Sequence, residues 1–209
     1  MTGKAVSHSD ASRAPWWYAR PMSTWSINVA DLGRDEALSP RRADFVREIV
    51  ETATSRVAGT EWRSAVRCDG DAAGTRCDGR ITVSLDPLGV IACSCGVCNQ
   101  AGIIRGFAGT AMDLSRHVPK GKTVTWGLDD ESRVVLLTAT SAVPALRAIV
   151  VRATPHKEVR GLLLVHATKR ELDAMYTLVE GLFTGTRGRR RRELLTELLA
   201  SLCSCIDGF

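Results

Sequence analysis

The seven cysteines of this 209-residue chain are unevenly spaced, and three of them, Cys93, Cys95 and Cys98, fall within six positions. The N-terminal segment lacks the apolar core that a signal peptide needs. The chain also contains no run of about eighteen apolar residues that would predict a transmembrane helix. We therefore predict a cytoplasmic protein with no membrane partner, in which thiols stay reduced. In that compartment, clustered cysteines favour a metal site or catalysis over structural disulfides.

Four of the cysteines have a pattern that predicts a zinc site. Cys95-Gly-Val-Cys98 has the spacing at which two thiolates reach one ion, and two cysteines upstream supply a second pair. Four soft thiolates in tetrahedral geometry suit zinc, and they leave no open position, so the predicted Zn²⁺ is structural. The upstream pair is separated by a loop of eight residues, longer than the usual two to four, and Cys93 is a competing ligand. The predicted ligands are Cys68, Cys77, Cys95 and Cys98.

A β-hairpin is predicted over about residues 79–94, because the segment Asp-Pro-Leu-Gly has the residues of a type I turn. Pairing outward from this turn places Cys77 opposite Cys98 and Arg80 opposite Cys95. The hairpin would thus bring an upstream cysteine to the C-x-x-C pair, as in a zinc ribbon.

Two other interpretations of the cysteines are a thiol redox centre and a set of small buried residues. A redox C-x-x-C typically opens a helix that follows a strand. Here Cys98 is followed by Asn-Gln-Ala-Gly-Ile-Ile-Arg-Gly-Phe, an apolar segment that predicts a strand. This context disfavours the redox centre.

The segment also resembles a family. The pattern C-x8-C-x-G-R-I-x-V, followed by C-x-x-C-x-x-x-G-I-I-x-G-F and Asp-Leu-Ser, is similar to a ribbon segment of uncharacterised bacterial zinc-ribbon-containing proteins. The resemblance covers about residues 66–115. It implies metal at the four predicted ligands with Cys93 outside the set, and it implies no particular activity.

The N-terminal half is predicted to contain a tail, a helix and short strands. Residues 1–24 predict a flexible tail; its aromatic group Trp16-Trp17-Tyr18 is either part of a disordered extension or a docking patch. Ser39 as N-cap and Pro40 at the first helical position predict the start of a helix. Its apolar face is predicted to comprise Phe45, Val46, Ile49, Val50 and Ala53, and a strand is predicted over Trp62–Arg67.

The C-terminal half is predicted to begin with strands and to end with two helices. Thr168 and Glu171 form a capping box that predicts a helix start, and a second apolar helical stripe follows the arginine-rich segment. We therefore predict an α+β fold with a zinc-ribbon hairpin, antiparallel strands and a C-terminal two-helix hairpin. The predicted regions are a tail (1–24), a helix with the ribbon (25–115), and strands followed by the helical hairpin (116–209). Strands are predicted at Lys122–Trp126, Arg133–Thr140, Leu146–Ala153 and Arg160–Ala167.

Five arginines gather at the predicted start of the last helix. Cations at this end oppose the positive end of the helix dipole, so the run breaks a local rule and suggests a function. Arginine side chains bind phosphate well. The alternative is a solvated basic turn, or one paired with Glu171 and Glu180 on the preceding helix. The arginines are Arg187, Arg189, Arg190, Arg191 and Arg192.

Functional predictions follow from what the chain contains. It has no G-x-S-x-G, P-loop, G-x-G-x-x-G or H-E-x-x-H motif, and His117, His156 and His166 have no setting typical of catalysis. A net charge of +5 permits an anionic partner. We predict a non-enzymatic, regulatory protein that binds nucleic acid or another polyanion through the arginine run. The alternative is a protein-interaction module, such as an adaptor or toxin-neutralising partner, and the third is a zinc or thiol enzyme.

Overall fold

The computed structural model describes residues 24–31, 38–72 and 74–208. The predicted tail with Trp16, Trp17 and Tyr18 lies outside the described residues apart from position 24. Within the described ranges, no helix combines the length and apolar character that a membrane crossing requires.

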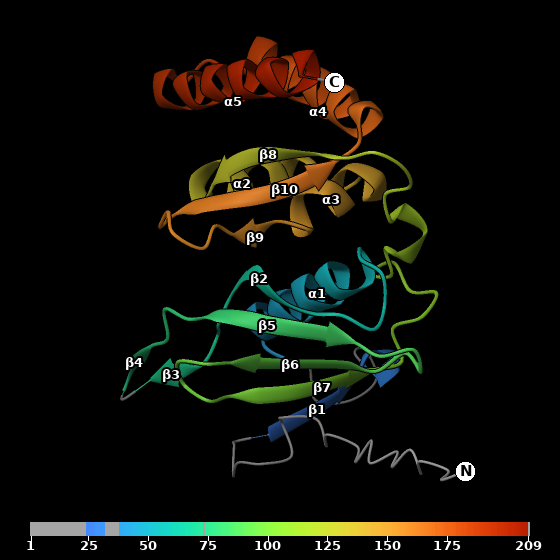
Figure 1. The fold of residues 1–209 in the computed structure, drawn as a ribbon. Coiled ribbons are helices and arrows are strands. Elements are labelled where there is room, and N and C mark those ends of the chain that lie inside the picture. Colours follow the sequence, from blue (N-terminus) through green and yellow to red (C-terminus); the bar gives the residue numbers. More distant parts are fainter. Residues whose placement is uncertain (1–23, 32–37, 73, 209) are drawn as a thin grey trace, which may run out of the picture.

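The first half of the fold is a five-stranded sheet with one helix packed on it (Figure 1). Its strand order is β1-β7-β6-β5-β2, antiparallel except for the parallel pair of β1 and β7. A small two-stranded hairpin and two short 3-10 helices lie in the connections. The elements are β1 (Thr24–Asn28), η2 (Val29–Asp31), α1 (Pro40–Thr54), β2 (Glu61–Arg67), β3 (Asp71–Ala72), β4 (Thr75–Arg76), β5 (Arg80–Leu85), β6 (Ile91–Cys95), β7 (Ala101–Arg105) and η3 (Ser115–His117).

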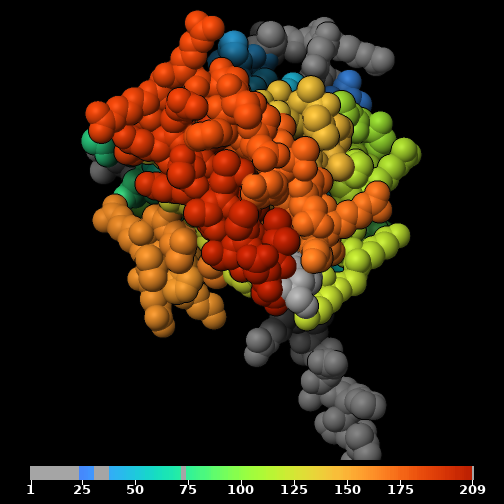
Figure 2. Space-filling view, turned by 90° about the horizontal axis from the view of Figure 1, so that it is seen from above, coloured from blue at the N-terminus to red at the C-terminus, as the bar shows by residue number. Residues whose placement is uncertain are grey.

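The second half is a three-stranded sheet of order β8-β10-β9 with four helices. Helices α4 and α5 lie together at the end of the molecule away from the first sheet (Figures 1 and 2). The elements are β8 (Val124–Asp129), α2 (Asp130–Ala139), α3 (Pro144–Val151), β9 (Thr154–Pro155), β10 (Leu162–Ala167), α4 (Lys169–Gly185) and α5 (Arg189–Asp207).

Helix α1 begins where the sequence predicts. The Ser39 side chain accepts a hydrogen bond from the backbone N–H of Arg42, and Pro40 occupies the first helical turn. The predicted apolar face is buried against the first sheet, which confirms its assignment: Phe45, Val46, Ile49, Val50 and Ala53.

The predicted hairpin is present as β5 and β6, but its register differs from the prediction by one residue. Ile81, not Arg80, pairs with Cys95. The turn forms as expected, with the Gly89 N–H donating to the Asp86 carbonyl at 3.2 Å. Gly89 has a φ of +77° and adds a bulge residue before β6, which shifts the pairing.

Two predicted strands, Arg133–Thr140 and Leu146–Ala153, are wrong, since these segments belong to α2 and α3. Their β-branched composition favours strands, but local start signals and burial outweigh it. Asp129 caps α2 by accepting hydrogen bonds from the Ser132 N–H and hydroxyl, and Pro144 opens α3. The last four residues of α3 are all buried, so its apolar run reflects a helix enclosed by neighbours.

The C-terminal helical hairpin is confirmed. Thr168 and Glu171 form the predicted capping box, with the Thr168 N–H donating to the Glu171 carboxylate at 2.8 Å. The buried residues of α5 are Leu194, Leu195, Leu198 and Leu202, on the predicted inner face. The architecture is therefore mixed α and β, with two sheets and five α-helices among the described residues.

The two halves have separate apolar cores, and charged residues join them. Asp130 at the start of α2 accepts hydrogen bonds from Arg80 at 2.7 and 2.8 Å and from Arg67 at 2.9 Å. Further ion pairs, Glu48–Arg133 and Glu51–Arg147, link α1 to α2 and α3 at 2.6 and 2.7 Å. Directed polar contacts therefore orient one half against the other.

We expect Asp130→Asn to weaken this junction in a pH-dependent way. Burial raises the pKa of Asp130. The hydrogen bonds and positive charges of Arg80 and Arg67 together lower this pKa by a larger amount, so the net shift is downward. The stabilisation is therefore present above the unfolded pKa of about 3.9 and is lost as the pH falls through the folded value. The variant should lower the free energy of unfolding by about 1–2 kcal/mol at neutral pH and flatten its acid dependence.

Urea unfolding at several pH values measures both effects. Asp173→Asn is the matched control, because Asp173 is an exposed carboxylate on α4 with no ion pair in the described structure. An Asp130→Asn protein with the same acid dependence as the control would contradict the expectation.

Candidate metal centre and arginine run

The four predicted cysteines come from two turns at one end of the first sheet. Cys68 follows β2 directly, and Cys95 ends β6 just before the turn that carries Cys98. The loop of eight residues after Cys68 brings Cys77 back beside Cys68, because β3 and β4 fold it into a small hairpin. The Cys77 N–H closes this hairpin by donating to the Gly70 carbonyl at 2.9 Å. The eight-residue spacing is thus compatible with one site.

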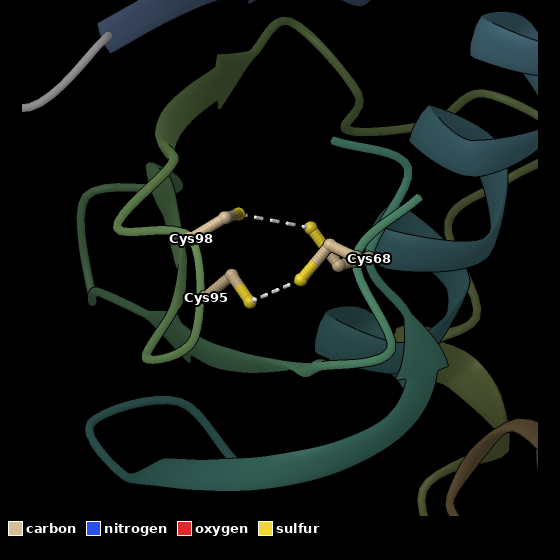
Figure 3. Close-up of side chains that lie close together, drawn as sticks. Cys68, Cys95 and Cys98 are labelled. Atoms are coloured by element: carbon tan, nitrogen blue, oxygen red, sulfur yellow. Dashed lines mark hydrogen bonds between the residues drawn. The ribbon is translucent and has the colours of Figure 1, made fainter. Parts of the chain in front are cut away.

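The four sulfur atoms converge on one point, and together they can hold a metal ion. All lie within 4.8 Å of one another, with 3.5 Å between Cys68 and Cys98 Sγ and 3.6 Å between Cys77 and Cys95 Sγ. Figure 3 shows the Cys68, Cys95 and Cys98 side chains pointing into the same space. A tetrahedral ion with bonds of about 2.3 Å needs sulfur atoms about 3.8 Å apart, whereas a disulfide needs about 2.05 Å. The spacing is therefore that of metal ligands.

Both upstream ligands lie in the same local motif, Cys-Asp-Gly, which occurs twice. The Gly70 N–H donates to Cys68 Sγ at 3.4 Å, and the Gly79 N–H donates to Cys77 Sγ at 3.3 Å. A Cβ atom on Gly79 would lie 2.5 Å from Cys95 Sγ. This repeat, which the prediction of the ligands did not use, is visible in the sequence and marks each upstream cysteine as a turn residue.

The thiols differ in acidity because their surroundings differ. Burial raises the pKa of Cys68 and of Cys77. Burial also raises the pKa of Cys95, but the backbone N–H groups of Cys98 and Val97 and the neighbouring thiols lower it, and the net shift is downward. Binding a metal would displace the remaining protons, because the thiolate is the ligand form.

Cys93 lies outside the cluster. It is 4% exposed within the first core, and its Sγ lies 3.5 Å from the Gly102 carbonyl oxygen, to which it donates. Burial raises the pKa of Cys93 to about 12. Its role is therefore that of a small core residue.

Helix α1 holds the first turn of the site. Arg42 forms an ion pair with Asp69, and its guanidinium lies 4.1 Å from the centre of the Trp25 ring. Arg41 donates to the Asp69 backbone carbonyl at 3.1 Å. These contacts, which no sequence pattern indicated, connect the cysteine turn to both α1 and β1.

The five arginines of the run are all exposed at the start of α5. Arg189 pairs with Glu193 at 2.9 Å, and Arg190 pairs with Glu131 of α2 at 2.8 Å. The alternative that Glu171 and Glu180 neutralise the run is wrong: Glu171 pairs with Arg152, and no arginine of the run forms an ion pair with Glu180 among the described residues.

The histidines lie apart from the cysteines. His156 sits in the predicted loop, where its Nδ1 accepts hydrogen bonds from two backbone N–H groups. His166 is exposed, because it lies on the open face of β10, where its Nδ1 is 3.1 Å from the Thr125 hydroxyl. Neither belongs to the group of four cysteines that could hold a metal ion.

Comparison with protein-family models, with curated proteins and with solved structures finds no match to this chain. The resemblance of residues 66–115 to ribbon-containing proteins therefore stays a prediction. Conclusions about function rest on this chain's own residues.

We predict that the protein binds one metal ion per chain and that Cys95→Ser abolishes this binding, because three thiolates remain. Cys93→Ser is the matched control, since it changes a neighbouring cysteine outside the cluster. Elemental analysis of the purified, reduced proteins measures metal per chain. Metal retained by Cys95→Ser, or lost from Cys93→Ser, would contradict this ligand set.

A second prediction concerns the close approach at Gly79. Gly79→Ala should weaken metal affinity about 10–100-fold, because the added methyl displaces Cys95 Sγ. Gly96→Ala lies in the same site but meets no atom within 4 Å, and we expect wild-type affinity. Competition with a chromogenic chelator ranks the affinities. Equal values for the two variants would show that this contact is unimportant.

Proposed function

We propose that the protein binds nucleic acid through the start of α5 and that a structural zinc ion holds its cysteine turns. For the metal, the support is a set of four thiolates at tetrahedral spacing. Zinc suits this ligand set among the biological ions. With four thiolates bound, no position is left for water or substrate, so the ion would supply stability rather than chemistry.

The observation that carries the nucleic-acid proposal is the exposure of the arginine run at a helix end without acidic residues. Arg189 and Arg190 are paired, yet their side chains are 93% and 75% exposed. Arg187 and Arg191 have no ion pair with any described residue, and Arg192 lies over the Phe183 ring at 5.0 Å. The run is therefore accessible and only partly neutralised.

The helix itself adds to the positive potential. Its N-cap is Gly188, which offers no side-chain hydrogen bond, and its first turn has no acidic residue. The free N–H groups and the helix dipole therefore favour an anion at this end. Phosphate groups are well suited, because an arginine can donate two parallel hydrogen bonds to one phosphate.

Other parts of the molecule extend this surface. Figures 1 and 2 place the start of α5, the loop between β9 and β10, and the β3–β4 hairpin on the same side of the molecule. The Arg190–Glu131 ion pair ties the start of α5 to α2, which carries Asp130 at the junction of the two halves. A strand of nucleic acid following this side would meet phosphate-binding groups in succession.

We predict that Arg187→Ala/Arg191→Ala weakens binding of a fluorescent oligonucleotide and reduces its salt dependence. Each lost phosphate contact should lower the slope of log K against log salt by about 1. Lys169→Ala/Arg170→Ala, an exposed cationic pair at the start of α4, is the control and should bind as wild type does.

Anisotropy titrations with single- and double-stranded oligonucleotides at several salt concentrations provide the measurement. Absence of wild-type binding at low salt would refute nucleic acid as the ligand. Equal losses in both double variants would assign the effect to net charge rather than to the start of α5.

A further inference from the structure

A pocket of about 540 Å³ lies between the cysteine turns and the loop that joins β9 to β10. One wall comes from β2 and from the turn residues Gly79 and Val97, which belong to the metal-binding end of the first sheet. The opposite wall is the loop over residues 155–161. Asp130 lies at the base, where the two halves meet.

The lining of this pocket is basic. Five arginine or lysine residues face three carboxylates, Asp78, Asp130 and Glu158, which leaves an excess of two positive charges among these eight groups. Another pocket beside α1 and α2 has four such cations against five carboxylates. A pocket beside the end of α1 has the same excess, but its two cations, Arg56 and Arg152, already donate to protein carbonyls or to Glu171. The five cations are Arg63, Arg67, Arg80, Lys157 and Arg160.

Within the pocket, the cations have different roles. Arg80 and Arg67 are held by Asp130, and Arg80 also donates to the Ala65 carbonyl. Arg63, Lys157 and Arg160 have no ion-pair partner among the residues that the structure describes. Because no acidic group satisfies them, these three can donate to an external anion.

The loop that carries two of them is well ordered by its own hydrogen bonds. His156 Nδ1 accepts from the N–H groups of Glu158 and Val159 at 3.1 and 3.0 Å, and the His156 N–H donates to the Leu162 carbonyl at 2.8 Å. Gly161 supplies the left-handed residue that returns the chain to β10, with a φ of +85°. Lys157 and Arg160 therefore project from a defined scaffold, which lowers the entropic cost of binding.

We infer that this pocket binds a phosphate group through Arg63, Lys157 and Arg160. A phosphate carries up to two negative charges and several acceptor oxygens, which match the charge excess and the donors. The inference rests on the proposed function for one source of the phosphate, which is a nucleic acid bound on this side of the molecule. The other source is a free ligand that carries the same group. It adds a second binding site, separate from the start of α5.

The test is a titration of inorganic phosphate into the full-length ¹⁵N-labelled protein, followed by the backbone amide signals of residues 156–161. Wild type should show saturable shifts. Lys157→Ala/Arg160→Ala should raise the dissociation constant at least about tenfold, because charge-assisted hydrogen bonds are lost. Both side chains are exposed, so the variant should keep the wild-type unfolding midpoint. Arg76→Ala, an exposed arginine outside this pocket, is the matched control and should titrate as wild type.

Absence of saturable shifts in wild type, or equal affinity in the double variant, would overturn the pocket. Oligonucleotides with and without a 5′-phosphate then identify the source. If wild type prefers the oligonucleotide with a 5′-phosphate and the double variant loses this preference, the pocket binds a terminal phosphate. If the double variant binds both oligonucleotides more weakly by the same factor, the pocket binds the backbone. If the double variant loses inorganic phosphate but binds both oligonucleotides as wild type does, the pocket binds a small ligand. In that last case the pocket stands without nucleic acid as its ligand, and the anisotropy titrations of the Arg187→Ala/Arg191→Ala variant decide the proposed function separately, so the two failures are distinguishable.

Discussion

A bulge in β2 is the constraint on which the rest of the structure depends. Pairing between β2 and β5 is interrupted between Arg63 and Arg67, and there Ala65 turns into the second core while Val66 stays in the first. Three backbone groups in the bulge find other partners: the Ala65 N–H donates to the Ala153 carbonyl, the Ala65 carbonyl accepts from Arg80, and the Val66 N–H donates to the Ser64 hydroxyl. One strand thereby serves both halves.

The candidate metal centre follows directly from this geometry. The bulge of β2 ends at Arg67, whose guanidinium pairs with Asp130. The next residue is the ligand Cys68. The same Asp130 carboxylate holds Arg80, which begins β5 three residues after Cys77. Cys68 and Cys77 thus lie close to Arg67 and Arg80, which the Asp130 carboxylate binds together. A change at the junction of the halves would therefore move the cysteine turns and the pocket beside them.

Local signals in the sequence were sufficient where a few adjacent residues decide the structure. Ser39 and the Thr168–Glu171 capping box give helix starts, and the grouping of four cysteines could be predicted because ligand spacing and a turn act over short distances. The failures arise where distant groups decide. Segment 146–153 is rich in β-branched residues yet helical, because burial among other helices outweighs intrinsic propensity. Segment 133–140 is different, because Val134 is 61% exposed and the Asp129 cap, a local signal, starts this helix. The Arg190–Glu131 pair joins positions far apart in the chain, and no pattern in either segment could reveal it.

Charge accounting separates the cations that hold the structure from those available to a ligand. The proposed Zn²⁺ ion with four thiolates would carry a net charge of −2, and an aspartate follows each upstream cysteine, so the loaded cysteine turns would need nearby cations. Arg42 supplies one such cation through its ion pair with Asp69, whereas Arg80 is held by Asp130 at the junction of the halves. The remaining cations on this side, in the pocket and at the start of α5, include several without any acidic partner in the described structure. Neutralising the cysteine turns does not account for these cations, and their position around one side of the molecule is the observation on which the proposed polyanionic ligand rests.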